Sequence, residues 1–534
     1  MTVDTSAASS ATPAPAGGSG RHRVAIIGSG FGGLWATEAL AKAPVDITMI
    51  SETSHHLFQP LLYQVATGVL SEGEVAPATR EVLKKQPNAM VLLGRVTDID
   101  LAARTVTSLS PLGTTVTPYD SLIAAAGAGQ SYFGNDHFSE FAPGMKSIDD
   151  ALELRGRIFG SFELAELCTD PADAEEWLTF VVVGAGPTGV EMAGQISELA
   201  HRTLRRDFRR IDTTKARIIL LDAAPAVLGV FGDRLSNIAR KQLESIGVEV
   251  QLNVKVVGVD NTGVDVIDPD GTHRRIRSRC KVWAAGVSAS PLGKQLAEQS
   301  GGEIDRAGRV KVNEDLTLPG HPEVFVVGDM MALNNLPGVA QVAMQGGKHA
   351  AGQITKRLRS EPAGQPFKYF DKGSMATISR FHAVCSVGNK IRLAGFTAWL
   401  MWLAVHVMYL VGFKNRFTTM IHWAVSFLFR GRSQRTTTRQ QIVARTLMAR
   451  LSATEEALDE ARAARTSVGV SQGGVNGTGD AGEDRTEAVD HEAAHDTVAE
   501  LSTAYGTTAE GAGEPKADDR ETEPTSGQSS GGGS

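Results

Sequence analysis

The chain has 534 residues, 42% of them hydrophobic, and three cysteines, so it can bury two or three domains without disulfide bonds. The formal charge is −7. Residues 466–534 carry 14 acidic and three basic side chains, a charge of −11, so the rest of the chain carries +4. That segment is poor in large apolar residues and is expected to be a disordered acidic tail. Residues 1–20 lack the features of a secretory signal, so we expect a disordered N-terminal tail and a cytoplasmic body.

The first predicted strand covers residues 24–27 and leads into a glycine-rich turn, 28–33, that opens a helix over 31–42. Glycines let such a turn bend tightly and approach a pyrophosphate, which lies on the positive end of the helix dipole. A second strand over 45–50 ends at Glu52, where a carboxylate can bind ribose hydroxyls. The candidate dinucleotide ligands of this unit are Gly28, Gly30, Phe31, Gly32, Gly33 and Glu52.

A second unit of the same kind begins with a strand at 180–183 and a turn at 184–189. Its helix is predicted to run through Leu199, with extra residues up to Arg210, before a strand at 217–221 that ends in Asp222. A carboxylate there pairs with the adenosine 2′-hydroxyl but repels a phosphate, which favours NADH over NADPH. The candidate ligands are Gly184, Gly186, Pro187, Thr188, Gly189 and Asp222. Two such units predict a protein that holds two dinucleotides.

The three cysteines are Cys168, Cys280 and Cys385. They lie far apart, and no CxxC or CxxxxC motif stands near either turn. This argues against flavoenzymes of the thioredoxin-reductase or glutathione-reductase type, which need a disulfide beside the flavin, and weakens a sulfide:quinone oxidoreductase. The histidines have no carboxylate at metal-ligand spacing, so we interpret them as structural and expect no metal.

A buried strand at 324–327 ends in Gly328-Asp329, far downstream of both turns. This ending resembles the flavin signature of flavoproteins with two dinucleotide-binding domains, in which the carboxylate holds the ribityl chain of FAD. The small-residue strand ends at 125–127 and 284–286 are similar to the crossover motifs of that superfamily. The resemblance implies cofactor contacts at Ala126, Gly127, Ala285, Gly286, Gly328 and Asp329. We expect FAD to be bound without a covalent bond, because no cysteine or histidine is expected near the flavin ring.

Residues 393–413 contain no Asp, Glu, Lys or Arg, and as one helix they would be about 31 Å long, enough to cross a bilayer. Residues 414–450 carry eight Lys or Arg and no acid, so a single crossing would invert the positive-inside rule. Together with the apolar run at 417–429, this favours a hairpin lying in one leaflet, with its arginines on anionic headgroups. A helix pair buried in a dimer interface is the alternative, and the two can coexist.

Three further stretches resemble motifs of type II, non-proton-pumping NADH:quinone oxidoreductases: residues 58–64, 340–346 and 412–416. The resemblance runs from about Val24 to Arg430. It implies an α/β fold with two Rossmann-like dinucleotide-binding domains, in which an NADH domain interrupts the FAD domain, and a C-terminal membrane-anchoring helical region. The implied ranges are 21–146 and 291–365 for the FAD domain, 147–290 for the NADH domain and 366–465 for the anchoring region.

By matching positions, the resemblance implies that Gln59 and Gln341 contact FAD, that Gln341 and Gln345 lie at the quinone entrance, and that Glu191 lies near the isoalloxazine. Hydride transfer needs no acid, base or metal, because the cofactors carry the chemistry. The two glutamines suit hydrogen-bond donors to quinone carbonyls, with a cation such as Lys414 or Arg416. They could equally be helix-surface residues against FAD, and the glutamate could equally bind ribose.

The sequence thus predicts a homodimeric, monotopic enzyme on the cytoplasmic side of the plasma membrane that passes electrons from NADH through FAD to a membrane quinone. No nucleic-acid partner is expected, since the arginine-rich segment follows two apolar runs and lacks a recognised nucleic-acid module. Two alternatives stay open. One is an FAD-dependent NADH reductase of a protein acceptor such as a ferredoxin, and the other is a flavin redox sensor without catalysis.

Overall fold

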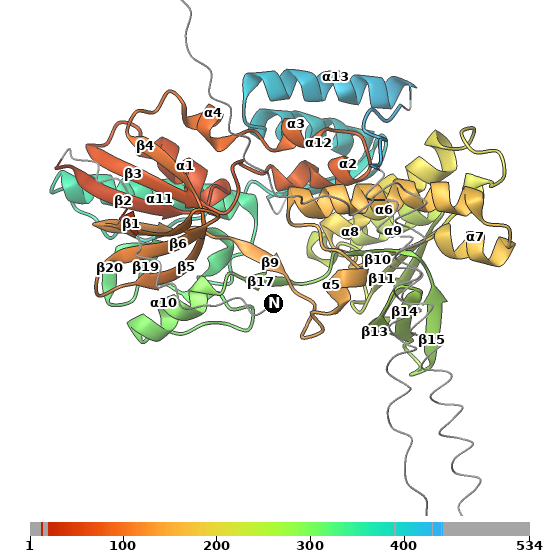
Figure 1. Ribbon diagram of the computed structural model, residues 1–534, viewed down its shortest axis with the longest axis horizontal. Helices are drawn as coiled ribbons and strands as arrows, with labels where there is room; N and C mark the ends of the chain where they lie inside the picture. The colour runs from red at the N-terminus through yellow and green to blue at the C-terminus, as the bar shows by residue number, and fades with distance from the viewer. Residues whose placement is uncertain (1–11, 14–19, 389–390, 430, 439–440, 442–534) are drawn as a thin grey trace, which may run out of the picture. The chain divides into compact units, whose positions relative to one another are not determined.

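The computed structural model describes residues 12–13, 20–388, 391–429, 431–438 and 441 (Figure 1). Its first layer is a six-stranded sheet in the order β19-β20-β8-β2-β3-β4. All neighbours are parallel except β19 and β20, so the carboxyl ends of β2, β3, β8 and β20 meet at one edge. The bounds are β2 His22–Ile27, β3 Val45–Ser51, β4 Ala89–Leu93, β8 Ser121–Ala124, β19 Thr317–Leu318 and β20 His321–Val326.

Helices α1 (Phe31–Ala39) and α11 (Ala340–Leu358) pack closely against each other beside this sheet. A Cβ on Gly347 would lie 2.2 Å from the carbonyl oxygen of Gly32, so the two backbones touch where neither residue has a side chain. The helix α1 begins where the sequence predicts and ends three residues earlier. The crossing holds the first turn of α11 beside the first glycine-rich turn.

The second layer is a parallel four-stranded sheet in the order β12-β11-β10-β16. Every residue of β10 and of β16 is buried, as is usual where helices cover both faces of a parallel sheet. The bounds are β10 Thr179–Val183, β11 Arg217–Asp222, β12 Val248–Leu252 and β16 Cys280–Trp283, with helices α6 Ile148–Leu167, α7 Pro171–Trp177, α8 Pro187–Glu198 and α9 Asp233–Ser245 around them.

Two antiparallel segments carry the chain between the sheets. The strand β9 (Ala128–Gln130) follows β8, and β17 (Val287–Ala289) follows β16. They pair with Ala128 opposite Ala289, so the outgoing and returning chains run side by side. The sequence predicts crossovers at these two places.

Smaller elements complete these layers. Two further antiparallel sheets, β7-β6-β5 with β1 at its edge and β13-β14-β15, and the pair β18-β21 lie outside the two main sheets. Their strands are β1 Thr12–Pro13, β5 Arg95–Asp100, β6 Thr105–Ser110, β7 Gly113–Pro118, β13 Lys255–Val259, β14 Gly263–Ile267, β15 His273–Arg277, β18 Val310–Lys311 and β21 Met331–Ala332. The shorter helices are α2 Leu62–Ala66, α3 Glu72–Val75, α4 Thr79–Leu83, α5 Phe138–Phe141 and α10 Leu292–Ser300.

The C-terminal part begins with a three-stranded antiparallel sheet that the sequence does not predict: β22 Ser374–Ser379, β23 His382–Val387 and β24 Ile391–Gly395. A Cβ on Gly194 would lie 1.8 Å from the carbonyl oxygen of Ile378, so this sheet sits directly on α8. Leu393 pairs with Cys385 in the sheet, so the predicted helix over 393–413 is wrong at its start. The helix α12 covers Phe396–Tyr409, and α13 covers Phe413–Phe429.

The helices α12 and α13 form the expected pair, with one buried and one exposed face. Trp399, Trp402 and Trp423 are at most 6% exposed and join the core. The opposite face exposes large apolar side chains: Phe396, Leu400, Met408, Phe413, Phe417, Met420, Ile421, Val425, Leu428 and Phe429. Among the described residues, no helix is both long and apolar enough to pass through a bilayer.

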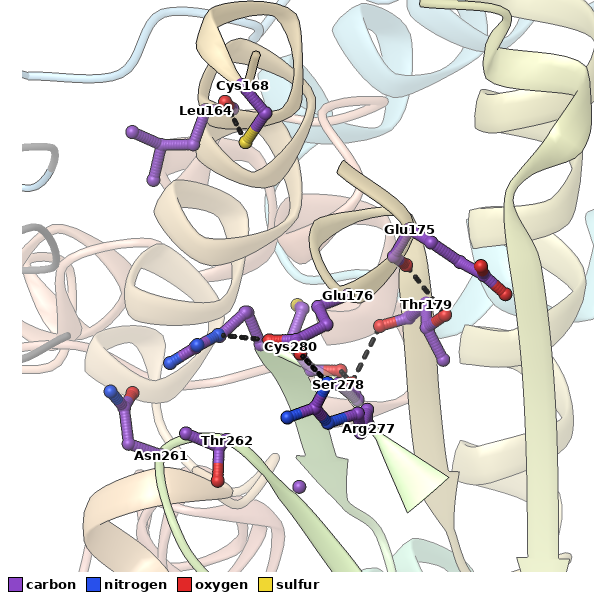
Figure 2. A network of polar contacts seen from close by, with 12 residues as sticks. Leu164, Cys168, Glu175, Glu176, Thr179, Asn261, Thr262, Arg277, Ser278 and Cys280 are labelled. Carbon is purple, nitrogen blue, oxygen red and sulfur yellow. Dashed lines mark hydrogen bonds and ion pairs between the residues drawn. The ribbon is translucent and has the colours of Figure 1, made fainter. Parts of the chain in front are cut away.

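The cysteines take part in local polar contacts within separate elements. Figure 2 shows Cys168 at the end of α6, where its thiol donates to the carbonyl of Leu164 at 3.3 Å, and Cys280 at the start of β16. Next to Cys280, the hydroxyl of Ser278 donates to the carbonyl of Thr179 at 2.6 Å and joins β16 to β10. All three cysteines are free thiols, as their spacing in the sequence predicts.

Candidate active site

The first glycine-rich turn joins β2 to α1. Gly28 has φ +98°, and a Cβ there would lie 2.4 Å from the carbonyl oxygen of Ala125, so only glycine fits. A Cβ on Gly33 would lie 1.9 Å from the carbonyl oxygen of Gly28, which fixes α1 against the turn. A Cβ on Gly30 would meet no atom within 4 Å. This open space at the N-terminus of α1 can hold a pyrophosphate.

The second turn, between β10 and α8, repeats this geometry. Gly184 has φ +108°, and a Cβ there would lie 2.7 Å from the backbone nitrogen of Ala285. A Cβ on Gly189 would lie 1.7 Å from the carbonyl oxygen of Gly184, whereas one on Gly186 would meet open space. Pro187 begins α8, where its missing N–H costs nothing, and Thr188 follows it.

Asp222 ends β11 next to this second turn. Its carboxylate accepts hydrogen bonds from the backbone N–H of Ala185 and, at 2.7 Å, from that of Ala224. The side chain therefore supports the turn as well as facing the place where an adenosine ribose would lie. Glu52, the corresponding acid of the first unit, is exposed just after β3.

Asp329 lies in a short 3-10 turn, Gly328–Met330, at the carboxyl end of β20. Burial raises the pKa of its carboxyl, while the positive charges of Lys146 and Arg309 act in the opposite direction. Gly328 has φ +71°, which turns the chain sharply toward this site. The sequence does not reveal Lys146, because its proximity depends on a contact between segments far apart in the chain.

The crossover residues come together near the start of both glycine-rich turns. Gln130 of β9 donates its side-chain amide to the carbonyl of Gly286 at 2.8 Å and also to that of Ala285. The backbone N–H of Ala126 points to the sulfur of Met330 at 3.1 Å, and Gly127 has φ +69°. Gln130 was missed by the sequence analysis, although its position just after a crossover could have indicated it.

Glu191 lies in the first turns of α8 and is 8% exposed. Burial raises the pKa of its carboxyl well above the usual range, and the backbone N–H of Thr377 opposes this by donating to it at 3.3 Å. Thr377 belongs to β22, so the unpredicted C-terminal sheet covers the predicted nicotinamide side of α8. A protonated carboxyl here can hold and donate a proton.

Residues 58–64 connect this region to the C-terminal helices. Gln64 donates its amide to the hydroxyl of Tyr63 at 3.0 Å, and its carbonyl accepts from the indole N–H of Trp423 at 2.6 Å. Tyr63 and Gln64 are both buried. Burial raises the pKa of Tyr63 well above the usual range, and Glu191 adds to this in second place. Gln59 lies in a 3-10 turn, Gln59–Leu61, at the start of the same segment.

The two predicted quinone-site glutamines lie one turn apart at the start of α11. Both amides are engaged by the backbone of residues 370–373. Gln341 donates to the carbonyl of Gly373 at 2.8 Å and accepts from the N–H of Lys372 at 3.1 Å. Gln345 donates to the carbonyl of Phe370 and accepts from its N–H, both at 3.0 Å. Thus each amide holds this segment with one N–H and its oxygen.

The segment 370–373 in turn contacts α12. Lys372 donates to the hydroxyl of Tyr409 at 2.6 Å, and its ammonium lies 5.1 Å from the centre of that ring. A cation that the sequence does not predict, Lys372, therefore lies on the segment that the glutamines bind. Of the predicted cations, Lys414 is exposed at the start of α13, and Arg416 donates to the carbonyl of Leu410 at 2.7 Å.

The histidines have structural surroundings. His56 is buried, donates to the carbonyl of Ser29 at 2.8 Å and packs edge-on against Phe31. His406 stacks on Trp402 and donates to its carbonyl at 2.7 Å. Within the described ranges, no group of His, Cys, Asp and Glu could hold a metal ion.

The residues at both turns fit dinucleotides. The space beside Gly30 and Gly186 lies at two helix N-termini, and each turn has an acidic residue at the end of the next strand, Glu52 or Asp222. At the first turn, the ring nitrogen Nε2 of His56 is buried without a partner among the described residues. FAD fits the first turn together with Asp329, and NADH fits the second.

Comparisons with known proteins agree with this geometry. The pyridine nucleotide-disulphide oxidoreductase family profile matches residues 22–347. Two type II NADH:quinone oxidoreductases of Mycobacterium tuberculosis are 62% and 60% identical to the chain, over 81% and 82% of it and 93% and 94% of their own lengths. One from Staphylococcus aureus is 30% identical over 69% of the chain and 90% of its own length.

Solved structures show the same fold at low identity. A structure of NDH2 from Plasmodium falciparum in complex with NADH matches 78% of this chain and 99% of its own, with a TM-score of 0.69 and 19% identity. A sulfide:quinone oxidoreductase from Aquifex aeolicus matches 77% of this chain and 96% of its own, with a TM-score of 0.59 and 19% identity. At these identities the likeness extends to the fold alone.

Proposed function

The chain belongs to the type II NADH:quinone oxidoreductases, FAD-dependent enzymes of the pyridine nucleotide-disulphide oxidoreductase family, and on this premise we propose how its residues divide the reaction. When bound, FAD supplies the two-electron chemistry that links hydride from NADH to reduction of a quinone. The protein's own residues bind and orient the two partners. The observation that carries this proposal is the pair of matching glycine-rich turns, joined by the β9–β17 crossover.

On the nicotinamide side, Gly184, Gly186 and Gly189 leave room for the pyrophosphate of NADH, and Asp222 faces its adenosine ribose. Glu191 lies farther along α8, where burial keeps its carboxyl protonated to higher pH than usual. We assign to it the holding of a proton close to the flavin ring. The contact with Thr377 orients the carboxyl, because a backbone N–H can only donate.

On the quinone side, the start of α11 and residues 370–373 form one unit. Gln341 and Gln345 hold this segment, and the remaining N–H of each amide is available to a quinone carbonyl. The ammonium of Lys372 stands at the same place, next to Tyr409. This arrangement supports a quinone-binding role for the unit and assigns the positioning of Lys372 to the two glutamines.

The exposed apolar face of α12 and α13 supports a membrane-surface location. With 14 and 17 residues, the two helices are about 21 Å and 26 Å long, so they can lie in the interface with their apolar side chains inserted. A quinone dissolved in the bilayer would then reach Lys372 along α12. We propose monotopic binding on the cytoplasmic side of the plasma membrane, electron transfer without proton pumping, and a homodimer.

Steady-state NADH oxidation by purified enzyme in lipid vesicles tests this function, with and without a membrane quinone. We expect oxidation to depend on the quinone in a saturable manner and to yield quinol. Equal or faster transfer to a ferredoxin, without stimulation by quinone, would favour the protein-acceptor reductase. Slow oxidation that no acceptor stimulates would favour the redox sensor.

A further inference from the structure

The segment after α8 carries an unusual density of positive charge that the dinucleotide sites do not use. We call residues 202–210 the arginine loop. Arginine occupies five of its nine positions, 202, 205, 206, 209 and 210, and all five side chains are exposed. Its only acid, Asp207, forms an ion pair with Arg435.

The backbone of the arginine loop is held mainly by groups other than its arginine side chains, of which Arg209 alone donates to carbonyls of the loop. The carboxylate of Glu166 on α6 accepts hydrogen bonds from three consecutive backbone N–H groups, those of Arg209, Arg210 and Ile211, at 2.9 to 3.0 Å. Leu204 is 1% exposed, and the ring of Phe208 lies 6.0 Å from that of Phe162. The loop therefore presents its guanidinium groups from a fixed support.

These guanidinium groups are only partly balanced by carboxylates. Across the residues that the structure describes, none of the five forms an ion pair within 4 Å, although Arg209 and Arg210 donate to backbone carbonyls. Glu166 and Asp212 interact electrostatically with Arg210 and Arg205, but five cations outnumber these two carboxylates, so an external anion stabilises the cluster. The natural ligand of such a surface is a phosphate or another anion.

The position of the loop indicates which anion. The 12 residues of α8 separate the loop from the second glycine-rich turn by about 18 Å, so a dinucleotide phosphate bound there does not reach it. The loop instead contacts the segment that follows α13. Arg435 contacts Asp207 and stands six residues after Phe429, which is 78% exposed on the apolar face of α13. An extended chain of that length spans at most about 21 Å.

One further contact and the view in Figure 1 support this location. Arg432, between α13 and the ion pair, lies 3.9 Å from Glu198 at the end of α8. In Figure 1, the yellow segment after α8 lies at the right of the view at the level of α12, on the side of the molecule where α13 is drawn. The arginine loop thus flanks the exposed apolar face, where basic residues meet lipid headgroups.

We infer that the arginine loop binds the phosphate groups of anionic lipids and gives the enzyme a preference for anionic membranes. This inference rests on the proposed membrane-surface location, and it assigns a second, electrostatic contact beside the apolar one. Each arginine near an anionic surface strengthens binding about fivefold. Added salt weakens such a contact, because it screens the charges.

The test compares binding of the full-length enzyme to vesicles of phosphatidylcholine alone and of phosphatidylcholine mixed with phosphatidylglycerol, by flotation. The variant Arg202→Gln/Arg205→Gln/Arg206→Gln removes three cations that make no described hydrogen bond or ion pair. We expect it to lose on the order of 100-fold in binding to anionic vesicles and little in binding to neutral ones. The corresponding triple lysine variant should restore most of the loss.

A control removes two exposed cations from elements that Figure 1 draws away from α13: Lys255→Gln on β13 and Lys294→Gln on α10. It should bind both vesicle types as the unaltered enzyme does. Unchanged anionic preference in the arginine-loop variant, or no preference in the unaltered enzyme, would overturn the inference while leaving the apolar contact intact. Failure of the unaltered enzyme to bind either vesicle would contradict the membrane location as well.

Discussion

Asp222 combines two tasks at the residue scale. Its carboxylate supports the second glycine-rich turn through Ala185 and Ala224. We propose that it also stands where the 2′-phosphate of NADPH would have to lie. At about 4 Å and an effective dielectric constant near 20, two like charges repel by on the order of 4 kcal/mol before screening. This repulsion is the physical reason for a preference for NADH.

We therefore expect the Asp222→Asn and Asp222→Ala variants to narrow the ratio of kcat/KM for NADH over NADPH by at least tenfold. The asparagine variant keeps an oxygen for the N–H of Ala185, so it separates charge from support of the turn. Steady-state kinetics with both nucleotides measures the ratio. An unchanged ratio in both variants would remove the role assigned to Asp222.

We propose that Gln341 and Gln345 act on the quinone. Replacing either by leucine removes hydrogen bonds to residues 370–373, each contributing about 0.5 to 1.5 kcal/mol, and loosens Lys372. We expect the apparent KM for quinone to rise several-fold while anaerobic flavin reduction by NADH stays unchanged. Gln353→Leu is a matched control, because that amide lies farther along α11 and binds Gly364. Slowed flavin reduction with normal quinone kinetics would show that the glutamines position FAD instead.

His406 gives the folded protein a defined pH dependence. Burial between α12 and the core lowers the pKa of its imidazole to about 4. As the pH falls below about 6.5, His406 becomes protonated in the unfolded chain but stays neutral in the folded one. The free energy of unfolding therefore decreases down to about pH 4, by up to about 3 kcal/mol.

The His406→Gln variant removes this titration and keeps a donor for the carbonyl of Trp402. Between about pH 7 and about pH 5, we expect the melting temperature of the unaltered enzyme to fall more than that of the variant. Differential scanning fluorimetry across this range measures both. Parallel curves would mean that His406 is exposed to solvent in the folded enzyme.

At the scale of elements, the glycine-rich turns were predictable from sequence, whereas their supports were not. Glycine spacing reports a backbone constraint that is local, so Gly28 and Gly184 could be placed without coordinates. Lys146, Gln130 and Thr377 act through contacts with segments more than 100 residues away, and a single sequence carries no signal for such pairs.

The C-terminal region shows the other limit of the sequence. The apolar run at 393–413 has the composition of a helix, yet its first residues complete β24 because β23 offers a free edge. The helix pair itself was expected. Which face of each helix would be buried depends on Trp402 and Trp423, which pack against each other and against residues 58–64.

The exposed face of α13 provides a test at the same scale. Truncation before α12 would remove Trp399, Trp402 and Trp423 and expose the core against which they pack, so surface variants give a sharper test. We expect Phe417→Ser/Ile421→Ser/Leu428→Ser to shift the enzyme from the membrane to the soluble fraction. Each substitution should lower the free energy of membrane binding by about 1 kcal/mol, because it removes a partly exposed apolar side chain. Flotation with neutral vesicles measures the shift.

The control for this variant removes similar apolar side chains elsewhere on the surface: Leu93→Ser/Leu112→Ser/Val230→Ser, all exposed. It should leave vesicle binding unchanged. Flavin content and far-UV circular dichroism should match the unaltered enzyme in both variants. Equal binding of all three proteins would place the membrane contact outside α13.

At the scale of the whole molecule, we propose that the two halves of the reaction lie on different elements. The proposed nicotinamide side consists of β10, α8 and the covering sheet of β22, and the proposed quinone side of α11, residues 370–373 and α12. The proposed quinone side lies close to the first glycine-rich turn, because α11 crosses α1 beside it. This separation lets each half-reaction be followed by itself.

The most direct measurement of the central claim is an anaerobic stopped-flow experiment on the enzyme bound to vesicles that contain quinone. NADH should bleach the flavin absorbance at a rate that does not depend on quinone, and the absorbance should then return at a rate proportional to the quinone in the bilayer, with one quinol formed per NADH. Bleaching without recovery in the presence of quinone would contradict the account.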